Sequence, residues 1–178
     1  MELTDLTAND KDLNILERIN EEAIPECERN SLADLLATGA EITGIYEDAE
    51  PVGFMVIRRS GELIYLAYLA VRHDLRSKGT GSKALRELIA KNAGCRIVVE
   101  YEAPDSSSEN SDMRTRRRNF YARNGFRSTG FFTFYDDTEF EIACAGEEFD
   151  AEEFCRFTEH LSAIVEDHIP KPYRRDGK

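Results

Sequence analysis

The chain has 178 residues, and 23 Lys and Arg against 35 Asp and Glu give it a formal net charge of −12 at pH 7. Apolar residues make up 41 % of the chain, and Gly (11) and Pro (5) occur at ordinary frequency, which excludes collagen-like and wholly disordered proteins. The longest uncharged apolar run, residues 63–71, is far shorter than the roughly 20 residues of a membrane helix, so we expect no membrane partner.

Charge and cysteine content indicate the setting in which the chain works. The amino terminus carries neither the basic nor the apolar region of a secretory signal. An acidic chain repels phosphate backbones, so we expect no nucleic-acid partner. Neither the four cysteines (Cys27, Cys95, Cys144 and Cys155) nor the three histidines show zinc-ligand spacing. We therefore expect a cytoplasmic protein with free thiols and no metal.

Two helices are predicted near the amino terminus. Apolar residues at helical spacing indicate a helix over residues 13–23 that ends before Pro25. Ser31 is a typical N-cap for a short second helix, and Gly39 is its expected end.

Three strand-like runs follow, over residues 42–47, 52–59 and 62–71. The short, turn-rich segments between them indicate an antiparallel meander. A polar loop over residues 72–80 then leads into the next helix.

That helix is expected to join two parallel strands. Its apolar residues share one face, and Gly94 closes it; they are Ala84, Leu85, Leu88 and Ile89. An unbroken apolar strand over residues 96–101 comes next, so strand, helix and strand form a βαβ unit with a right-handed crossover.

An Arg-rich helix over residues 112–123 and strands near 126–135 and 138–145 complete the sheet. A meander followed by a βαβ unit and further strands predicts an α+β fold with a mixed central β-sheet flanked by helices.

The remainder of the chain carries one more helix. Asp150 and Glu153 form a plausible capping box for it, and it packs against its own core unless it supports a dimer. We predict a main domain over residues 1–146, a C-terminal helix over 147–169 on the same domain, and a frayed basic tail over 170–178.

The loop from Arg76 to Ser82 carries the clearest chemical signal. Its glycines let several backbone N–H groups turn toward one point at a helix start, and Arg76, Lys78 and Lys83 add positive charge. This pattern predicts a diphosphate cradle, and the alternative is a solvated turn. A Walker A loop is excluded because Ser82, not Lys, follows Gly81.

A dinucleotide-binding fingerprint is a rival interpretation of the same loop. Residues 79–84 fit Gly-x-Gly-x-x-Gly/Ala, and Glu100 and Glu102 follow at about the distance expected of a ribose-binding acid. Against it, residues 72–78 separate the glycines from the strand, and one βαβ unit cannot supply two mononucleotide halves.

Three segments resemble the GNAT acetyltransferases. Leu69-Ala70-Val71 followed by Arg76-x-x-Gly79-x-Gly81 is similar to the family's acyl-CoA motif, R/Q-x-x-G-x-G/A. The segment Phe120-Tyr121-Ala122-Arg123-Asn124-Gly125-Phe126 resembles its second signature, and Pro51-Val52-Gly53-Phe54 the opening of its third strand. The order of elements is similar over residues 1–146, which implies a GNAT-type acyl-CoA N-acyltransferase fold.

The resemblance implies a binding mode for acetyl-CoA. The pantetheine arm would pair with the Val71 backbone between two splayed strands, and the Leu69 N–H would polarise the thioester carbonyl. The expected cofactor-binding residues are Leu69, Ala70, Val71, Arg76, Ser77, Lys78, Gly79, Thr80, Gly81, Ser82 and Arg117.

The resemblance also assigns a general acid. Tyr121 matches the family position that returns a proton to the leaving thiolate, a role that suits a phenol at neutral pH. The alternative is an aromatic side chain that packs beside Phe120 at the end of a helix.

The general base departs from the family pattern. Many members carry a Glu where this chain has Tyr65, so that carboxylate is missing. Glu100 and Glu102 share one strand face and could bind or deprotonate an ammonium group, unless both are simply solvated. Glu102 is the predicted base, with a water relay as the alternative.

The Arg-rich helix departs as well. Arg114 and Arg117 stand where the family usually has an Asn and a small residue. Arg117, one turn before Tyr121, could instead bind a CoA phosphate.

These patterns predict an N-acetyltransferase that moves an acetyl group from acetyl-CoA to a primary amine by direct attack in a ternary complex. The acceptor is a small molecule, or an amino group of a peptide or protein, and the enzyme a monomer or homodimer. The alternatives are a non-catalytic CoA-binding sensor on the same fold and a dinucleotide-binding oxidoreductase.

Overall fold

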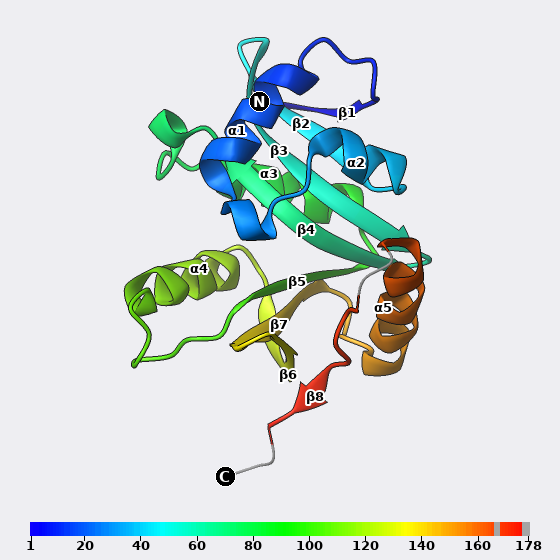
Figure 1. Cartoon of the computed structure of the whole chain (residues 1–178). Coiled ribbons are helices and arrows are strands. Elements are labelled where there is room, and N and C mark those ends of the chain that lie inside the picture. Colours follow the sequence, from blue (N-terminus) through cyan, green and yellow to red (C-terminus); the bar gives the residue numbers. More distant parts are fainter. Residues whose placement is uncertain (166–167, 176–178) are drawn as a thin grey trace. The chain divides into compact units, whose positions relative to one another are not determined.

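A computed structural model describes residues 1–165 and 168–175. It confirms the α+β fold: eight strands form a mixed sheet in the order β1-β2-β3-β4-β5-β7-β6-β8, with helices flanking it (Figure 1). The strands are β1 (Glu2–Leu6), β2 (Glu41–Glu47), β3 (Glu50–Ser60), β4 (Leu63–Val71), β5 (Arg96–Glu102), β6 (Arg127–Tyr135), β7 (Thr138–Gly146) and β8 (Tyr173–Arg174). The helices are α1 (Leu13–Ala23), α2 (Leu32–Ala37), α3 (Thr80–Lys91), α4 (Ser111–Arg123) and α5 (Ala151–Val165), with short 3-10 turns η1 (Glu26–Glu28) and η2 (His73–Leu75).

The chain divides into two compact units that share β4. The first unit is Met1–Arg59 with Leu66–Lys91, and the second is Ser60–Tyr65 with the chain from Asn92 onward. The boundaries expected after residues 146 and 169 stay predictions. None of the described helices is both long enough and apolar enough to cross a membrane.

The first unit packs α1 and α2 on one face of an antiparallel sheet. Leu16, Leu32 and Phe54 are fully buried in this core. The predicted N-cap is confirmed, because the Ser31 side chain accepts a hydrogen bond from the Asp34 N–H at 3.1 Å. The sequence does not predict β1, because its residues are mostly exposed and only Leu6 is buried in the core.

The second unit begins with the predicted parallel pairing. Leu63–Tyr65 of β4 pair with Arg96–Val98 of β5, and β7 and β6 extend the sheet in antiparallel order. Residues of β5 alternate between two faces: Val98 packs with α5, whereas the Tyr101 ring stacks on Tyr121 of α4. The unit therefore carries α4 and α5 on opposite faces of β5.

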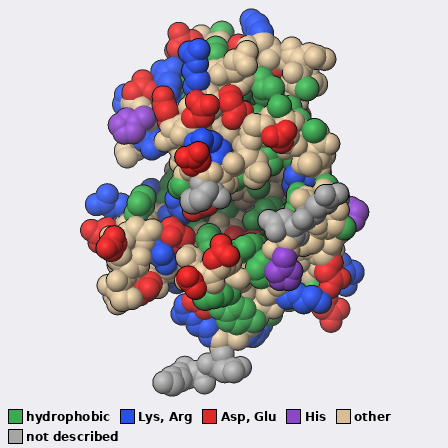
Figure 2. Space-filling view, viewed as in Figure 1, with side chains coloured by type: hydrophobic (Ala, Val, Ile, Leu, Met, Phe, Trp, Pro, Cys, Tyr) green, Lys and Arg blue, Asp and Glu red, His purple; other side chains and the backbone are tan. Residues whose placement is uncertain are grey.

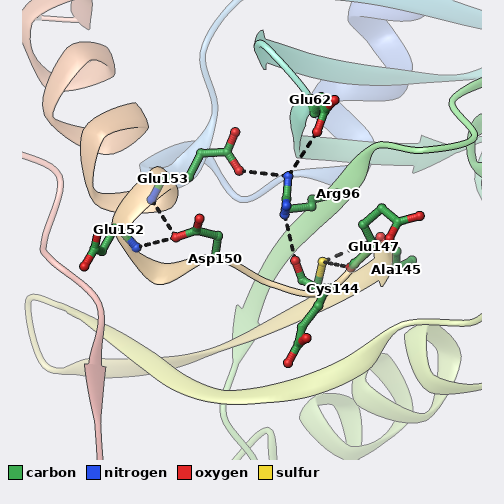
Figure 3. Close-up of polar contacts among 9 residues, drawn as sticks. Glu62, Arg96, Cys144, Ala145, Glu147, Asp150, Glu152 and Glu153 are labelled. Atoms are coloured by element: carbon green, nitrogen blue, oxygen red, sulfur yellow. Dashed lines mark hydrogen bonds and ion pairs between the residues drawn. The ribbon is translucent and has the colours of Figure 1, made fainter.

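Arg96 joins the start of β5 to the start of α5 (Figure 3). Its guanidinium lies 3.3 Å from the Glu153 carboxylate and 3.4 Å from that of Glu62. Asp150 caps α5 as predicted, because its Oδ1 accepts hydrogen bonds from the N–H groups of residues 152 and 153 at 2.9 and 3.0 Å. The Glu153 carboxylate, expected to close the capping box, pairs with Arg96 instead.

The prediction of a frayed tail is wrong for part of the C-terminus. β8 pairs antiparallel with β6, and the Arg174 guanidinium lies 4.5 Å from the centroid of the Phe131 ring. Glu139 accepts a hydrogen bond from the Tyr173 hydroxyl at 2.5 Å and pairs with Arg175. Residues 176–178 of the predicted tail, and 166–167 of the predicted helical region, lie outside the described residues.

Candidate functional site

The first unit contains the predicted phosphate loop between β4 and α3. Two of its residues have left-handed backbone conformations, Ser77 at φ +64° and Gly79 at φ +93°. In the part of the chain that the structure describes, the N–H groups of Gly79, Thr80 and Gly81 have no hydrogen-bond partner. They lie at the positive end of the α3 dipole, where backbone amides bind anions.

Side chains hold this loop in place on both sides. The buried Thr80 hydroxyl donates to Glu47 Oε1 at 3.1 Å. Arg76 Nε donates to the Val71 carbonyl oxygen at 3.1 Å, so this carbonyl, predicted to meet pantetheine, has a partner within the chain. The Thr80 contact leaves the backbone amide of Thr80 available to a ligand.

The predicted pantetheine segment lies on β4 in the same unit. Ala70 is buried, and Leu69 and Val71 are half-buried. Within the described residues, the ladder between β4 and β5 is confined to Leu63–Tyr65 on β4, before this segment begins.

Tyr121, the predicted acid, lies on α4 in the second unit. Its ring stacks on Tyr101 with centroids 5.5 Å apart and meets Phe126 edge-on at 5.3 Å. Burial raises the pKa of Tyr121 to about 12, against a smaller opposing effect of Arg117. The phenol therefore stays protonated at neutral pH, as a proton donor must, and the aromatic packing foreseen as the alternative is present as well.

Glu102, the predicted base, is the counter-ion of the Arg-rich helix. Its carboxylate lies 3.0 Å from Arg114 and 3.6 Å from Arg117, and it accepts a hydrogen bond from Asn110 Nδ2 at 3.1 Å. Its role as base stays a prediction, although these contacts engage the oxygens that a base would use. Arg117 is still 43 % exposed in its side chain and can reach other anions.

Glu100 has different surroundings. Each of its carboxylate oxygens accepts at least one hydrogen bond, from the hydroxyls of Thr133, Tyr65 and Tyr135. Glu100 was a candidate from the sequence, but its donors could not be predicted because they lie 33 to 35 residues away along the chain. Strand alternation signalled only the face on which Glu100 lies.

The structure thus gathers the candidate residues in two groups. Leu69–Val71 and Arg76–Ser82 belong to the first unit, whereas Glu102, Arg117 and Tyr121 belong to the second. A pocket in the second unit contains none of them; it is lined by Arg127, Ser128, Thr129, Phe131, Cys144, Glu148, Phe149 and Arg174.

A family model described as an acetyltransferase (GNAT) domain matches residues 39–128, half of the chain. The chain belongs to the GNAT acetyltransferase family. All of the predicted site residues lie within the matched segment. The protein is accordingly an enzyme of acetyl-CoA-dependent acyl transfer, and the resemblance seen in its motifs is confirmed.

Solved structures of GNAT proteins share this fold. A protein of Bacteroides thetaiotaomicron assigned to the GNAT acetyltransferase family is 26 % identical, with a TM-score of 0.74 over 93 % of this chain and 98 % of that one. A GNAT acetyltransferase of Elizabethkingia anophelis, solved with acetyl-CoA bound, is 18 % identical, with a TM-score of 0.62 over 82 % and 97 %.

A third structure is that of the ribosomal-protein-S18-alanine N-acetyltransferase of Escherichia coli. It is 14 % identical, with a TM-score of 0.62 over 84 % of this chain and 96 % of that one. At these low identities the last two structures bear on the fold alone. Among the curated proteins, none matches this chain.

Proposed function

We propose that this GNAT enzyme transfers an acetyl group from acetyl-CoA to a primary amine by direct attack in a ternary complex. The observation that carries the proposal is the phosphate loop, whose amides at Gly79, Thr80 and Gly81 have no partner within the described residues. Three such donors at a helix start suit the diphosphate of coenzyme A.

Each part of acetyl-CoA has a proposed partner. The backbone of Arg76–Ser82 holds the pyrophosphate, and Arg117 binds a further phosphate. The pantetheine arm pairs with the Val71 backbone, whose carbonyl oxygen accepts one hydrogen bond from Arg76 and has a second lone pair for a ligand. The Leu69 N–H donates to the thioester oxygen as negative charge develops there.

The chemistry needs no covalent enzyme intermediate. The neutral amine attacks the thioester carbon, a C–N bond forms and the C–S bond breaks. Tyr121 donates its phenolic proton to the leaving thiolate, a transfer supported by the raised pKa of about 12 that keeps the phenol protonated. The N–H proton lost by the new amide returns to the tyrosine through solvent.

The acceptor we propose is an amino group of a small molecule, peptide or protein. A net charge of −12 favours a cationic acceptor, and acidic side chains are spread among basic ones over the face drawn in Figure 2. A cytoplasmic location and a monomeric or dimeric state belong to the same proposal.

The CoA-binding sensor, suggested by Tyr65 at the position where the family often has a Glu, is set aside because the chain belongs to a family of acetyltransferases. The dinucleotide-binding alternative is set aside, because the chain belongs to an acetyltransferase family.

Calorimetric titration with acetyl-CoA, followed by a thiol-release assay, tests the proposal. The acceptors are a diamine, an aminoglycoside, a peptide with a free N-terminal alanine and a peptide with an internal lysine. We expect binding, and thiol release that depends on at least one acceptor. Binding with no acceptor-dependent release would contradict the proposed primary-amine acceptor, and no binding would contradict the proposed use of acetyl-CoA.

A further inference from the structure

A carboxylate without a cationic partner lies on the α5 face of the second unit. Glu100 Oε2 accepts hydrogen bonds from the hydroxyl of Tyr65 at 2.9 Å and from that of Tyr135 at 3.5 Å. The fully buried Thr133 hydroxyl donates to Oε1. Among the described residues, no Lys, Arg or His forms an ion pair with Glu100.

Three strands and a helix position this group. The register pairs Tyr65 of β4 with Val98 of β5, so Glu100 lies two residues further along the same face. The Tyr65 ring packs against Phe154 and Phe157 of α5, with centroid distances of 6.2 and 5.6 Å. These rings hold the aromatic part of Tyr65, whose hydroxyl donates to Glu100, and Glu100 itself is half-buried.

Keeping the Glu100 carboxylate ionised in these surroundings costs free energy unless a cation compensates for the lost solvation. Burial raises the pKa of the Glu100 carboxyl above its usual value, even though three hydroxyls donate to its charged form. A carboxylate kept at such a site without a cation is typical of a functional group, because an incoming cation relieves the cost. Glu102, two residues away, already has two arginines.

We infer that Glu100, held by the hydroxyls of Tyr65, Thr133 and Tyr135, binds the ammonium group of the acceptor and is the general base. This inference rests on the proposed function and names its acceptor as a protonated primary amine. The ammonium transfers one proton to the Glu100 carboxylate, and the resulting neutral amine has the lone pair needed for attack. Glu100 then returns that proton to solvent.

The same geometry explains the Glu that is missing from β4. Tyr65 occupies the position where many family members have a carboxylate, and its hydroxyl contacts the carboxylate supplied by the neighbouring strand. The base is therefore relocated from β4 to β5. This removes the observation that favoured a sensor.

The groups that surround Glu100 set its titration. Tyr65 faces it from β4 and Tyr135 from β6, whereas Ile142 of β7 stands opposite it in the register. Several charged residues of α5 form ion pairs that do not involve Glu100; the pairs are Glu153 with Arg96, Arg156 with Glu152, and Glu159 with Lys171.

The test measures kcat/KM for the best acceptor against pH at saturating acetyl-CoA. Glu100→Gln should lower kcat/KM by about a hundredfold or more and abolish its acid limb, since general-base catalysis contributes roughly 10²–10⁴-fold. Tyr65→Phe removes a donor to the charged form, so its acid limb should move to higher pH. Glu62→Gln is the matched control, because this carboxylate is 72 % exposed in its side chain; we expect a wild-type profile.

Acetyl-CoA affinity and thermal unfolding check that the variants are folded. If Glu100→Gln does not fold, the inference is tested by the pH profile of Tyr65→Phe, whose acid limb should lie at higher pH than that of wild type. The inference would be overturned if folded Glu100→Gln kept the kcat/KM and the acid limb of the wild-type pH profile. It would also be overturned if the acid limb of Tyr65→Phe did not move. Neither result would affect the proposed function. Wild-type protein that binds acetyl-CoA but acetylates none of the four acceptors would overturn the proposed function, and this inference with it.

Discussion

The two faces of β5 carry two ionisable groups, the buried Tyr121 and the half-buried Glu100, to which we assign opposite roles in proton transfer. Tyr121 lies on the α4 face in an aromatic stack with Tyr101, and Glu100 lies on the α5 face among hydroxyls. Burial raises the pKa of both groups. The same physical cause keeps the phenol protonated, as an acid should be, and makes the carboxylate a stronger base.

Glu102 shows that two side chains on the same face of a strand can have different functions. It has the same residue type and the same parity as Glu100, yet it contacts Arg114 and Arg117. Its carboxylate therefore serves the Arg-rich helix. The chemistry of each carboxylate is set by its partners from other elements.

The largest expected effect is on the acid face. Tyr121→Phe should lower kcat by about 10²-fold or more, because it removes the proton donor and keeps the ring. The dissociation constant of acetyl-CoA should be unchanged by calorimetry. Tyr101→Phe, which removes the hydroxyl of the stacking partner, is the control and should keep wild-type turnover. Equal turnover in the two variants would remove Tyr121 from the acid role.

The next effect separates Glu102 from Glu100 by stability. Glu102→Gln should lower the free energy of unfolding by about 2 kcal/mol, since it leaves Arg114 and Arg117 without their carboxylate. Urea denaturation measures this loss. The exposed Glu109→Gln should change stability by less than about 0.5 kcal/mol. A loss no larger than that of the control would show that the arginine contacts contribute nothing.

A third change acts on binding instead of turnover. Gly79→Val should weaken acetyl-CoA binding by about tenfold, because a β-branched residue is strained at φ +93° and shifts the loop amides. Calorimetry measures the affinity. Gly61→Val is matched, since Gly61 also has a positive φ (+60°) and open space for a side chain, but lies outside the loop. Equal affinities for the two variants would count against the cradle.

The smallest effect is a pH-dependent gain in stability. The folded-state pKa of Glu100 is raised above its usual value of 4.5, so wild-type protein loses stability as pH rises from there through the folded pKa. Glu100→Gln resembles the protonated form and does not lose it. We compare the Tm of the variant minus that of wild type at two pH values. This difference should be about 2–4 °C larger at pH 7.5 than at pH 4. A difference in Tm that does not change with pH would show that ionisation of Glu100 does not lower the stability of the folded protein.

Local patterns made much of the fold predictable. The N-caps at Ser31 and Asp150 and the loop from Arg76 to Ser82 depend on neighbouring residues, and the sequence shows them directly. β1 and β8 could not be foreseen, because each is a polar edge segment stabilised by pairing with a distant strand.

The candidate site was predictable to the same extent. The residues predicted to bind the cofactor through their backbone follow from a motif, as does the predicted acid Tyr121, and both assignments stay predictions. Strand alternation places Glu100 and Glu102 on one face and cannot distinguish them, so the sequence pattern alone could not decide between the two as base. The donors to Glu100 come from β4 and β6, and only the folded register brings them to it.

The most direct test of acetyl transfer is product analysis by mass spectrometry after incubation with acetyl-CoA and each primary amine. We expect acetylated amine and free CoA in equal amounts with wild-type protein, and neither above background with the double variant Tyr121→Phe/Glu100→Gln. Free CoA without acetylated amine, or equal product from the double variant, would contradict it.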